Sequence, residues 1–293
     1  MSSAPAPSAW FAAPDLPGPR LALIAIGPED AEEFCRALGS PAEAEQVLEH
    51  LSYGPPDSPA QARALIERFL ADDDRIAYAQ RLRSTGELVG TTSFYQIRPD
   101  ARSIAIGHTW LARRHWGTGL NAESKLLMLR RAFDRLAAER VVWHTDVRNA
   151  RSQAAIERLG ATRDGLLRHH RVRRDGSWRD TVQYSMLRAE WPAARLGLVD
   201  RLPLAVERHP AASRYRAVIG VEQVGVVDYV EADGVAVITH TRTEPVWRRC
   251  GLAARTTALV LADLRARGLG VRAQCSFTRT YLAGHPEWAD LVR

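Results

Sequence analysis

Residues 110–136, WLARRHWGTGLNAESKLLMLRRAFDRL, have residue types and a spacing that could bind a phosphate group. The stretch begins as an apolar strand end, passes through a basic turn containing Gly117 and Gly119, and continues with apolar residues at helical spacing. A helix start presents free backbone N–H groups, and the helix dipole there favours negative charge. The glycines would let the backbone approach a bulky anion. A plain turn is the competing interpretation, because glycine is common in turns before helices.

A second stretch repeats this series about 130 residues later. The turn EPVWRRCGL, residues 244–252, follows a predicted strand at 235–242 and leads into a predicted helix at 252–267. Chance turns rarely recur at the same place in the same series of elements. The repetition therefore favours a binding function over the plain-turn interpretation.

The elements that must position the first turn form an α+β unit with a mixed sheet. Hydrophobic periodicity, Pro28 at a helix start and the Asp175-Gly176 hairpin signal define them. The predicted strands are 20–26, about 75–83, 87–97, 103–111, 140–147, 162–172 and 179–188. The predicted helices are 28–38, 41–51, 58–72, the long helix after the turn, and 149–160.

The rest of the sequence predicts a second, smaller unit, an N-terminal arm and a linker between the two units. Its predicted strands are 204–208, 214–219, 223–231, 235–242 and 269–275, and its predicted helices are 252–267 and 277–284. The resulting domain prediction is a flexible N-terminal arm at 1–19, a first unit at 20–194, a linker at 195–203 and a second unit at 204–293. Proline, alanine and serine dominate the arm, and Trp10 and Phe11 could fix it to the body.

Residues 20–191 resemble the RimJ/RimL-like branch of the GCN5-related N-acetyltransferases over most of their length. The resemblance implies an acyl-CoA N-acyltransferase fold, a mixed, mostly antiparallel sheet flanked by helices. The matching pieces are Trp116-Gly117-Thr118-Gly119-Leu120-Asn121, Asp146-Val147-Arg148-Asn149-Ala150-Arg151-Ser152-Gln153-Ala154-Ala155, Leu159-Gly160-Ala161, Asp175-Gly176-Ser177-Trp178-Arg179-Asp180 and Tyr184-Ser185.

The family's diphosphate loop, [QR]-x-x-G-x-[GA], can be placed on this turn in two registers. Arg114-x-x-Gly117-x-Gly119 matches the letters but leaves the helix starting late. Trp116-x-x-Gly119-x-Asn121 fits the branch better, although it departs from the strict pattern at both ends. We prefer the second register, with Gly119 in the key position.

The resemblance implies roles for residues on both sides of the turn. Backbone amides near Leu111 and in the loop would hold pantetheine and diphosphate, with Asn149 against the pantetheine arm and Ser152 near the sulfur as proton donor. A plain N-cap competes for Asn149, and a helix-surface serine competes for Ser152. The predicted cofactor-binding residues here are Leu111, Trp116, Gly117, Thr118, Gly119, Leu120, Asn121 and Asn149.

Residues 204–293 resemble a second, compact branch of the superfamily, the YjdJ/NATD1-like acetyltransferases. Arg248-x-x-Gly251-x-Ala253 fits the loop pattern strictly, but Arg249 and Cys250 stand where that branch often has glycine and a polar residue. Cys275 would lie by the CoA sulfur, with a buried apolar cysteine as the alternative. The predicted loop residues are Arg248, Arg249, Cys250, Gly251, Leu252 and Ala253; the matches outside the loop are 238–241, 275–277 and 281–288.

Two further residues near the first turn have structural interpretations. His108, in the strand before the turn, could line an acceptor slot or carry a proton, but a lone strand histidine is more often structural. Glu123 resembles an acidic position of the family, yet an acid in a helix's first turn needs no catalytic explanation. We assign no general base.

The charge composition indicates which kinds of binding partner are expected. The net charge is +6, from 40 basic and 34 acidic residues, and Lys125 is the only lysine. The basic residues are spread along the chain and interleaved with acids, which argues against a dedicated nucleic-acid binder and leaves a mild attraction for acidic ligands.

The cysteines and the hydropathy pattern indicate in which cellular compartment the protein is expected. The three cysteines, Cys35, Cys250 and Cys275, form no disulfide or zinc spacing, so no metal is expected. No apolar run is long enough to span a bilayer, and the N-terminus lacks a signal-peptide pattern. We expect a cytoplasmic monomer or homodimer without membrane or nucleic-acid partners.

The functional prediction is an N-acetyltransferase with two acetyltransferase-like units. The resemblance implies direct attack of a primary amine on the acetyl thioester of acetyl-CoA. The acceptor would be a protein N-terminal α-amine or a small-molecule amine. The alternative is one active unit, the first, fused to a non-catalytic CoA-binding or interaction module.

Overall fold

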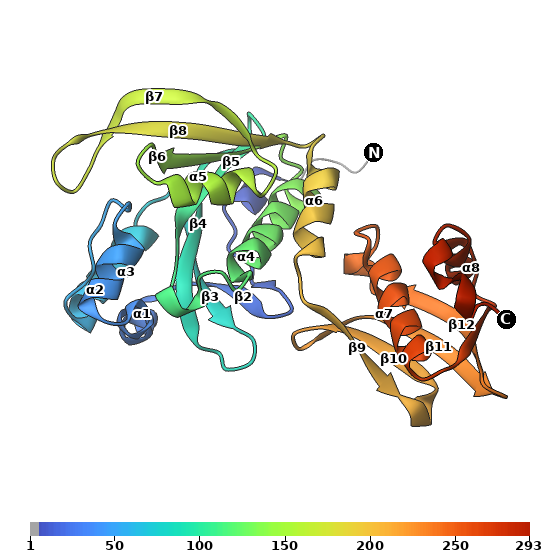
Figure 1. Ribbon diagram of the computed structural model, residues 1–293. Helices are drawn as coiled ribbons and strands as arrows, with labels where there is room; N and C mark the ends of the chain where they lie inside the picture. Colours follow the sequence, from blue (N-terminus) through green and yellow to red (C-terminus); the bar gives the residue numbers. More distant parts are fainter. Residues whose placement is uncertain (1–5) are drawn as a thin grey trace. The chain divides into compact units, whose positions relative to one another are not determined.

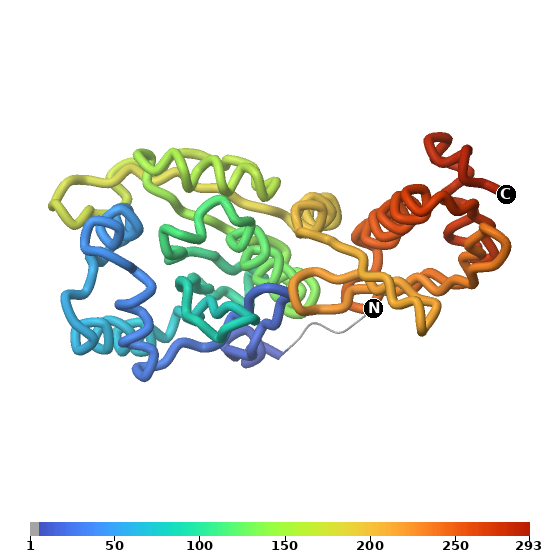
Figure 2. The backbone as a smooth tube through the Cα atoms, turned by 60° about the horizontal axis from the view of Figure 1, so that its bottom comes forward, coloured from blue at the N-terminus to red at the C-terminus, as the bar shows by residue number. Residues whose placement is uncertain are grey.

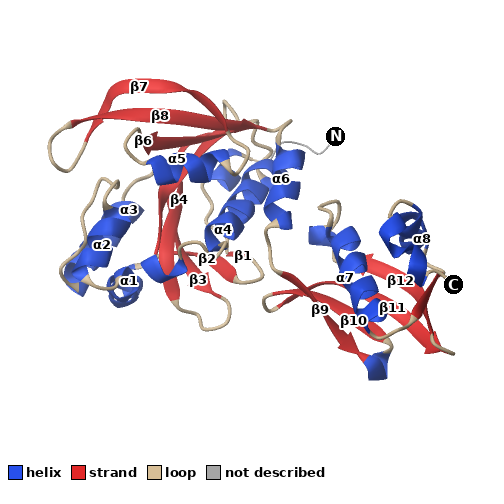
Figure 3. Cartoon of the chain, in the orientation of Figure 1, coloured by secondary structure: helices blue, strands red, loops and turns tan. Residues whose placement is uncertain are grey.

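The computed structural model describes residues 6–293, which divide into two compact units (Figure 1). The first unit ends at Leu198 and the second begins at Val199. Each unit has its own sheet, in which most neighbouring strands are antiparallel, with helices packed against it (Figure 3). The predicted fold class, two mixed, mostly antiparallel sheets flanked by helices, is confirmed.

An eight-stranded sheet forms the centre of the first unit, in the order β1-β2-β3-β4-β5-β6-β8-β7. The β5–β6 pair is parallel, and it pairs only where Ser103–Ala105 meet Arg140–Val142. Beyond these residues β5 and β6 no longer pair with each other, so the two strands separate at the end that leads to the glycine turn. The strands are β1 (Leu16–Pro17), β2 (Leu21–Ala25), β3 (Arg75–Leu82), β4 (Leu88–Arg98), β5 (Ser103–Leu111), β6 (Arg140–Asp146), β7 (Thr162–Val172) and β8 (Trp178–Leu187).

Helices cover both faces of this sheet. Trp110 of β5 packs edge-on against Phe34 of α1 at 5.0 Å, whereas its neighbour Thr109 contacts Lys125 of α4. Because successive strand residues point to opposite faces, α1 and α4 lie on opposite faces. The first face carries the short turn η2 (Pro28–Asp30) with α1 (Ala31–Leu38), α2 (Pro41–Leu48) and α3 (Pro59–Leu70); the other helices are α4 (Leu120–Leu129) and α5 (Ala150–Glu157).

The long helix after the turn is not α-helical throughout. It passes into a π-helical turn, η4 (Arg130–Arg135), in which Leu136 N donates to Arg131 O at 2.9 Å, five residues back. Arg131 uses its Nη2 to donate to Ala9 O and Ala12 O, both at 2.8 Å. The early chain therefore lies beside this helix (Figure 2).

The N-terminal segment and the segment between the two units both differ from their predictions. Residues 7–19 are not a flexible arm: Pro7–Trp10 form the turn η1, Trp10 is 2% exposed, and β1 pairs with β2. Residues 1–5 lie outside the described part of the chain. The predicted linker begins inside a helix, α6 (Trp191–Asp200), because Trp191 stacks on Phe133 and donates its Nε1–H to Asp134 at 2.8 Å.

The second unit repeats the arrangement on a five-stranded sheet, in the order β13-β12-β11-β10-β9. Its parallel pair is β12–β13, and α7 (Leu252–Ala266) connects these two strands as α4 connects β5 and β6. The remaining elements are β9 (Leu204–His209), η5 (Pro210–Ala212), β10 (Arg214–Ile219), β11 (Glu222–Ala232), β12 (Val235–Thr243), β13 (Gly270–Ala273), α8 (Ser276–Ala283) and η7 (Pro286–Leu291).

Neither a membrane span nor a metal cluster is found in the described part of the chain. No helix within residues 6–293 is both long and apolar enough to cross a bilayer. Nor do those residues contain a group of three or more His, Cys, Asp or Glu side chains arranged to hold a metal ion.

Candidate functional site

The first glycine turn has a backbone shaped to bind an anion. After β5, the chain makes a 3-10 turn, η3 (Arg113–His115), and Gly117 and Gly119 then take left-handed φ values of 77° and 82°. Glycine adopts these angles without the steric cost that other residues meet. Gly119 is the N-cap of α4, and no side chain of the described residues caps that helix. The first N–H groups of α4 are therefore available to a ligand.

The second turn has the same backbone, displaced by 132 residues (251 − 119 = 132). It has a 3-10 turn, η6 (Pro245–Trp247), then Arg249 at φ 58° and Gly251 at φ 77° as the N-cap of α7. Arg249 takes the place of Gly117. A non-glycine residue in this region costs about 1 to 2 kcal/mol, so the second turn holds this backbone under some strain.

Side-chain hydrogen bonds within the two turns also correspond. Trp116 Nε1 donates to Leu111 O at 2.9 Å, and Arg248 Nε donates to Thr243 O at 3.3 Å. The indole N–H of Trp116 thus makes the bond that the motif's arginine makes in the second turn. This correspondence favours the register in which Trp116 and Gly119 match Arg248 and Gly251.

Cys250 has a structural part in its turn that sequence analysis did not foresee. It is 3% exposed, and its Sγ donates to Trp247 O at 2.8 Å. Thr118 makes the matching bond, from Oγ1 to His115 O at 2.8 Å. Cys250 therefore closes the turn through its side chain, as Thr118 does.

The N-terminus of α5 lies against the first turn. The Arg151 guanidinium lies over the Trp116 ring at 3.6 Å, and Arg113 contacts the same ring at 4.4 Å. Burial lowers the pKa of Arg151. Sequence analysis missed these cations, because their closeness depends on β5 and β6 ending at the same edge of the sheet.

Asn149 and Ser152 meet at the start of α5. Asn149 is the N-cap, and its Oδ1 accepts from Ser152 N at 2.9 Å, so the capping interpretation of Asn149 holds in the structure. Ser152, on the first turn of the helix, is partly exposed. A cap engages one oxygen of Asn149 and leaves its amide N–H groups for a ligand.

Cys275 occupies the N-cap position of α8, as Asn149 does in α5. Burial raises the pKa of its thiol. The interactions with Thr278 N–H and with the Thr278 and Thr241 hydroxyls lower that pKa by more than burial raises it. The net pKa lies below the ordinary thiol value, and the side chain is only partly buried. Cys275 also packs against the buried apolar core of the second unit, and it is partly rather than fully buried.

Glu123 anchors the helix of the first turn. Its carboxylate is fully buried and accepts from Arg20 N at 2.7 Å, Leu21 N at 3.1 Å and Arg20 Nε at 2.7 Å. Arg20 also donates from Nη1 to Thr118 O at 3.0 Å. The structure thus supports a positioning role for Glu123, and Arg20 is a loop-supporting residue that sequence analysis missed.

Lys125 is buried against hydroxyl groups. Its Nζ donates to Thr109 Oγ1 at 2.7 Å and to Thr92 Oγ1 at 3.0 Å. Burial lowers the pKa of Lys125 to about 7. The ammonium form is therefore only partly populated near neutral pH.

Replacing Lys125 with methionine is expected to change how stability depends on pH. The folded pKa lies below the ordinary value of 10.5, so between about pH 7 and 10 the unfolded chain binds more protons. The unfolding free energy should therefore rise with pH in this window, by up to about 1.4 kcal/mol per unit. Urea unfolding at pH 7, 8 and 9 should show this slope in the wild type and a smaller one in Lys125→Met. Equal slopes would contradict the assignment.

The face of the sheet opposite α4 carries a histidine at a strand irregularity. His108 has a φ of 49° where the β4–β5 register shifts. Its ring packs edge-on against Tyr95 at 4.8 Å, and Tyr95 Oη lies 2.8 Å from His144 Nδ1. Burial, with smaller contributions from nearby arginines, lowers the pKa of His108 to about 3. An imidazole with that pKa is a poor base near neutral pH.

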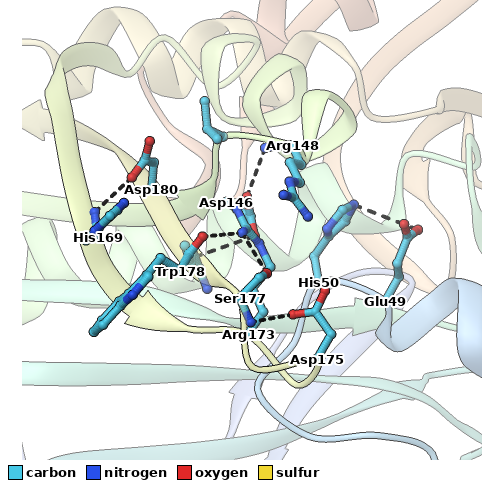
Figure 4. Close-up of polar contacts among 12 residues, drawn as sticks. Glu49, His50, Asp146, Arg148, His169, Arg173, Asp175, Ser177, Trp178 and Asp180 are labelled. Atoms are coloured by element: carbon cyan, nitrogen blue, oxygen red, sulfur yellow. Dashed lines mark hydrogen bonds and ion pairs between the residues drawn. The ribbon is translucent and has the colours of Figure 1, made fainter.

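The β7–β8 hairpin is fixed beside this face by a buried ion pair (Figure 4). The Asp146 carboxylate, at the end of β6, accepts hydrogen bonds from Arg173 Nε at 2.6 Å and Arg173 Nη2 at 2.9 Å. It also accepts one from Arg148 N at 2.9 Å. The carboxylate of Asp146 thereby neutralises the positive charge of Arg173. Arg174 further ties the hairpin tip to Glu45 of α2 at 3.0 Å.

Comparison with known proteins assigns a family to each unit. Residues 20–162 match the model of the acetyltransferase (GNAT) domain, and residues 214–291 match a model described as GCN5-related N-acetyl-transferase. The chain is 31% identical over 106 residues to "Putative ribosomal N-acetyltransferase YdaF" of Bacillus subtilis, a match covering 36% of this chain and 57% of YdaF.

Two further proteins match over nearly their whole length. "Uncharacterized N-acetyltransferase YoaA" of Bacillus subtilis is 27% identical over 180 residues, 60% of this chain and 97% of YoaA. A crystal structure described as a putative acetyltransferase from T. thermophilus is 36% identical with a TM-score of 0.60, covering 66% of this chain and 99% of that one. This chain is therefore an acetyltransferase that belongs to the GCN5-related N-acetyltransferase (GNAT) family, with one such domain in each unit.

Proposed function

We propose that the first unit transfers the acetyl group of acetyl-CoA to a primary amine by direct attack. The observation that carries this proposal is the turn after β5. Gly117 and Gly119 hold it in left-handed backbone, and it leads into the uncapped start of α4 beside strands that separate. A diphosphate fits this turn, because free N–H groups and the helix dipole both favour an anion.

The proposed roles follow the residues around the turn. Backbone N–H groups of residues 117–121 bind the diphosphate, with Trp116, Arg113 and Arg151 bordering it. Leu111 and Asn149 contact the pantetheine arm where β5 and β6 stop pairing. The amine nitrogen attacks the thioester carbon, the C–S bond breaks, and Ser152 delivers a proton to the leaving thiolate. The nitrogen releases a proton to solvent, and solvent returns one to Ser152. Backbone N–H groups stabilise the oxyanion.

The second unit is proposed to bind acetyl-CoA in the same way. Arg248 and the backbone of Arg249, Cys250, Gly251, Leu252 and Ala253 form the corresponding turn. Cys275, at the corresponding helix start, is placed beside the CoA sulfur. The acceptor of the chain is proposed to be a protein N-terminal α-amine or a small-molecule amine. The name of YdaF, a putative ribosomal N-acetyltransferase, supports a protein acceptor.

Steady-state kinetics with the full chain test this proposal. Thiol release from acetyl-CoA should depend on an added amine, and the acetylated amine should be found by mass spectrometry. Direct attack requires both substrates on the enzyme together, so initial-rate plots at several fixed amine concentrations should intersect. Parallel lines with a trapped acetyl-enzyme would refute direct attack. Absence of thiol release with N-terminal peptides and with small amines would refute the amine acceptor.

A further inference from the structure

Arginines gather on the sheet face that carries His108. Arg171 of β7 and Arg179 of β8 are direct partners across the hairpin, next to its Val172–Trp178 pair. Directly opposite residues of an antiparallel pair project from the same face, and like charges placed there repel. The fold gains no stability from this pairing, which suggests that another group uses it.

A third arginine, Arg75 of β3, points to the same place. Its guanidinium lies over the Phe69 ring at 3.8 Å, and its Nε donates to Ser93 Oγ at 3.0 Å. The charges of Arg75, Arg171 and Arg179 all act on the His108 imidazole and lower its pKa. The three guanidinium groups, from β3 and from the hairpin, therefore all act electrostatically on one histidine.

Carboxylates compensate these charges poorly. Asp146 lies 4.0 Å from Arg179 Nε but is already held by two bonds from Arg173. Asp72 acts electrostatically on Arg75 and raises its pKa, but burial lowers that pKa by more. Arg179 is 14% exposed at its side chain, and its Nε and Arg75 Nη2 are buried without a hydrogen-bond partner in the described residues.

The neighbouring histidines add no charge at neutral pH. Burial lowers the pKa of His108 to about 3 and that of His144 to about 4. The pKa of His170 is also lowered, by burial and by Arg171 and Arg179. The cluster thus combines three permanent cations with neutral rings that can line a binding surface.

The cluster lies where an acceptor would approach. His108 follows the three residues of β5 that pair with β6, and His144 follows those of β6, so both flank the point where the strands separate. They lie on the α1–α3 face, away from α4. Tyr53, between α2 and α3, also acts electrostatically on Arg75.

We propose that the amine acceptor carries a carboxylate, and that Arg171 and Arg179 bind this carboxylate with Arg75 beside them. A planar guanidinium matches a carboxylate with two parallel hydrogen bonds, and Arg75 Nη2 and Arg179 Nε supply donors that lack partners within the described part of the protein. This inference rests on the proposed acetyl transfer and names the acceptor class of the same site.

Matched acceptors test it on the wild-type chain. One pair is two N-terminal peptides that differ only by Glu→Gln at the second residue, and the other is free glutamate against its diamide. A hydrogen bond to a charged group is worth about 1.5 to 3 kcal/mol, so kcat/KM should fall about 10- to 150-fold when the carboxylate is replaced. The peptide and free-acid arms show whether the carboxylate belongs to a protein chain or a small molecule.

Two variants locate the effect. Arg179→Gln and Arg171→Gln should each remove most of the preference for the carboxylate acceptor and leave the KM for acetyl-CoA unchanged. Arg168→Gln makes the same charge change at an exposed position of the same hairpin and should keep the preference. When it is measured in a Gly251→Asp background, an unchanged acetyl-CoA KM also shows that the first unit of each variant folds.

The outcomes separate the two proposals. Turnover with equal kcat/KM for both members of each pair, or a preference that survives in Arg179→Gln and Arg171→Gln, would overturn the carboxylate inference alone. If no amine of either class caused thiol release, the proposed function would be overturned as well.

Discussion

Replacing Gly119 with aspartate is expected to lower acetyl transfer by the first unit by about 100-fold or more. The new Cβ would lie 3.3 Å from Arg20 Nη2, and its carboxylate would stand at the N-cap of α4. A second anion at a diphosphate site costs several kcal/mol, and about 2.7 kcal/mol corresponds to 100-fold. Thiol release should be measured in a Gly251→Asp background, so that only the first turn contributes.

Gly86→Asp is the matched control for this change. Gly86 has nearly the same left-handed φ, 76°, and an added Cβ there meets nothing within 4 Å. The variant should lose about 1 kcal/mol of stability or less, with an unchanged rate of transfer. If Gly119→Asp and Gly86→Asp transferred acetyl groups equally fast, the first turn would not be the diphosphate site.

Replacing Glu123 with glutamine is expected to destabilise the first unit by about 3 kcal/mol, since breaking a buried ion pair costs about 3 to 5 kcal/mol. The buried carboxylate accepts three hydrogen bonds, from two backbone N–H groups and Arg20 Nε. The new amide NH₂ would face one of these donors, and the guanidinium would lose its counter-ion. Urea unfolding of the full chain, followed through the first unit's transition, measures the loss.

Glu87→Gln provides the comparison. Glu87 pairs with Arg114 on the surface, where both side chains are exposed, and such pairs contribute about 1 kcal/mol or less. A Glu123→Gln variant no less stable than Glu87→Gln would show that Glu123 does not anchor the turn. Loss of activity without loss of stability would point to a direct catalytic part instead.

The strands and helices were largely predictable from local signals. Most predicted boundaries lie within a residue or two of the observed ones, because alternation, helix starts such as Pro41 after Ser40, and the Asp175-Gly176 turn are encoded locally. The π-helical turn and the packing of residues 7–19 were not predictable. They depend on Arg131 reaching Ala9 and Ala12, over more than 100 residues of sequence.

The glycine turns were also predictable, but their surroundings were only partly so. The correspondence between Trp116 and Arg248 depends on a hydrogen bond that sequence letters do not show. Arg20, Arg151 and Arg75 reach the site from distant elements. The Arg171–Arg179 pair had a local signal, since a hairpin centred on residues 175 and 176 places these residues opposite each other.

Calorimetric titration of the full chain with acetyl-CoA tests the central claim most directly. The two corresponding turns predict two sites per wild-type chain, one site in Gly119→Asp, one in Gly251→Asp, and none in the double variant. A double variant that binds acetyl-CoA like the wild type would contradict the assignment of both turns. A single site in the wild type, retained in Gly251→Asp, would contradict the assignment of the second.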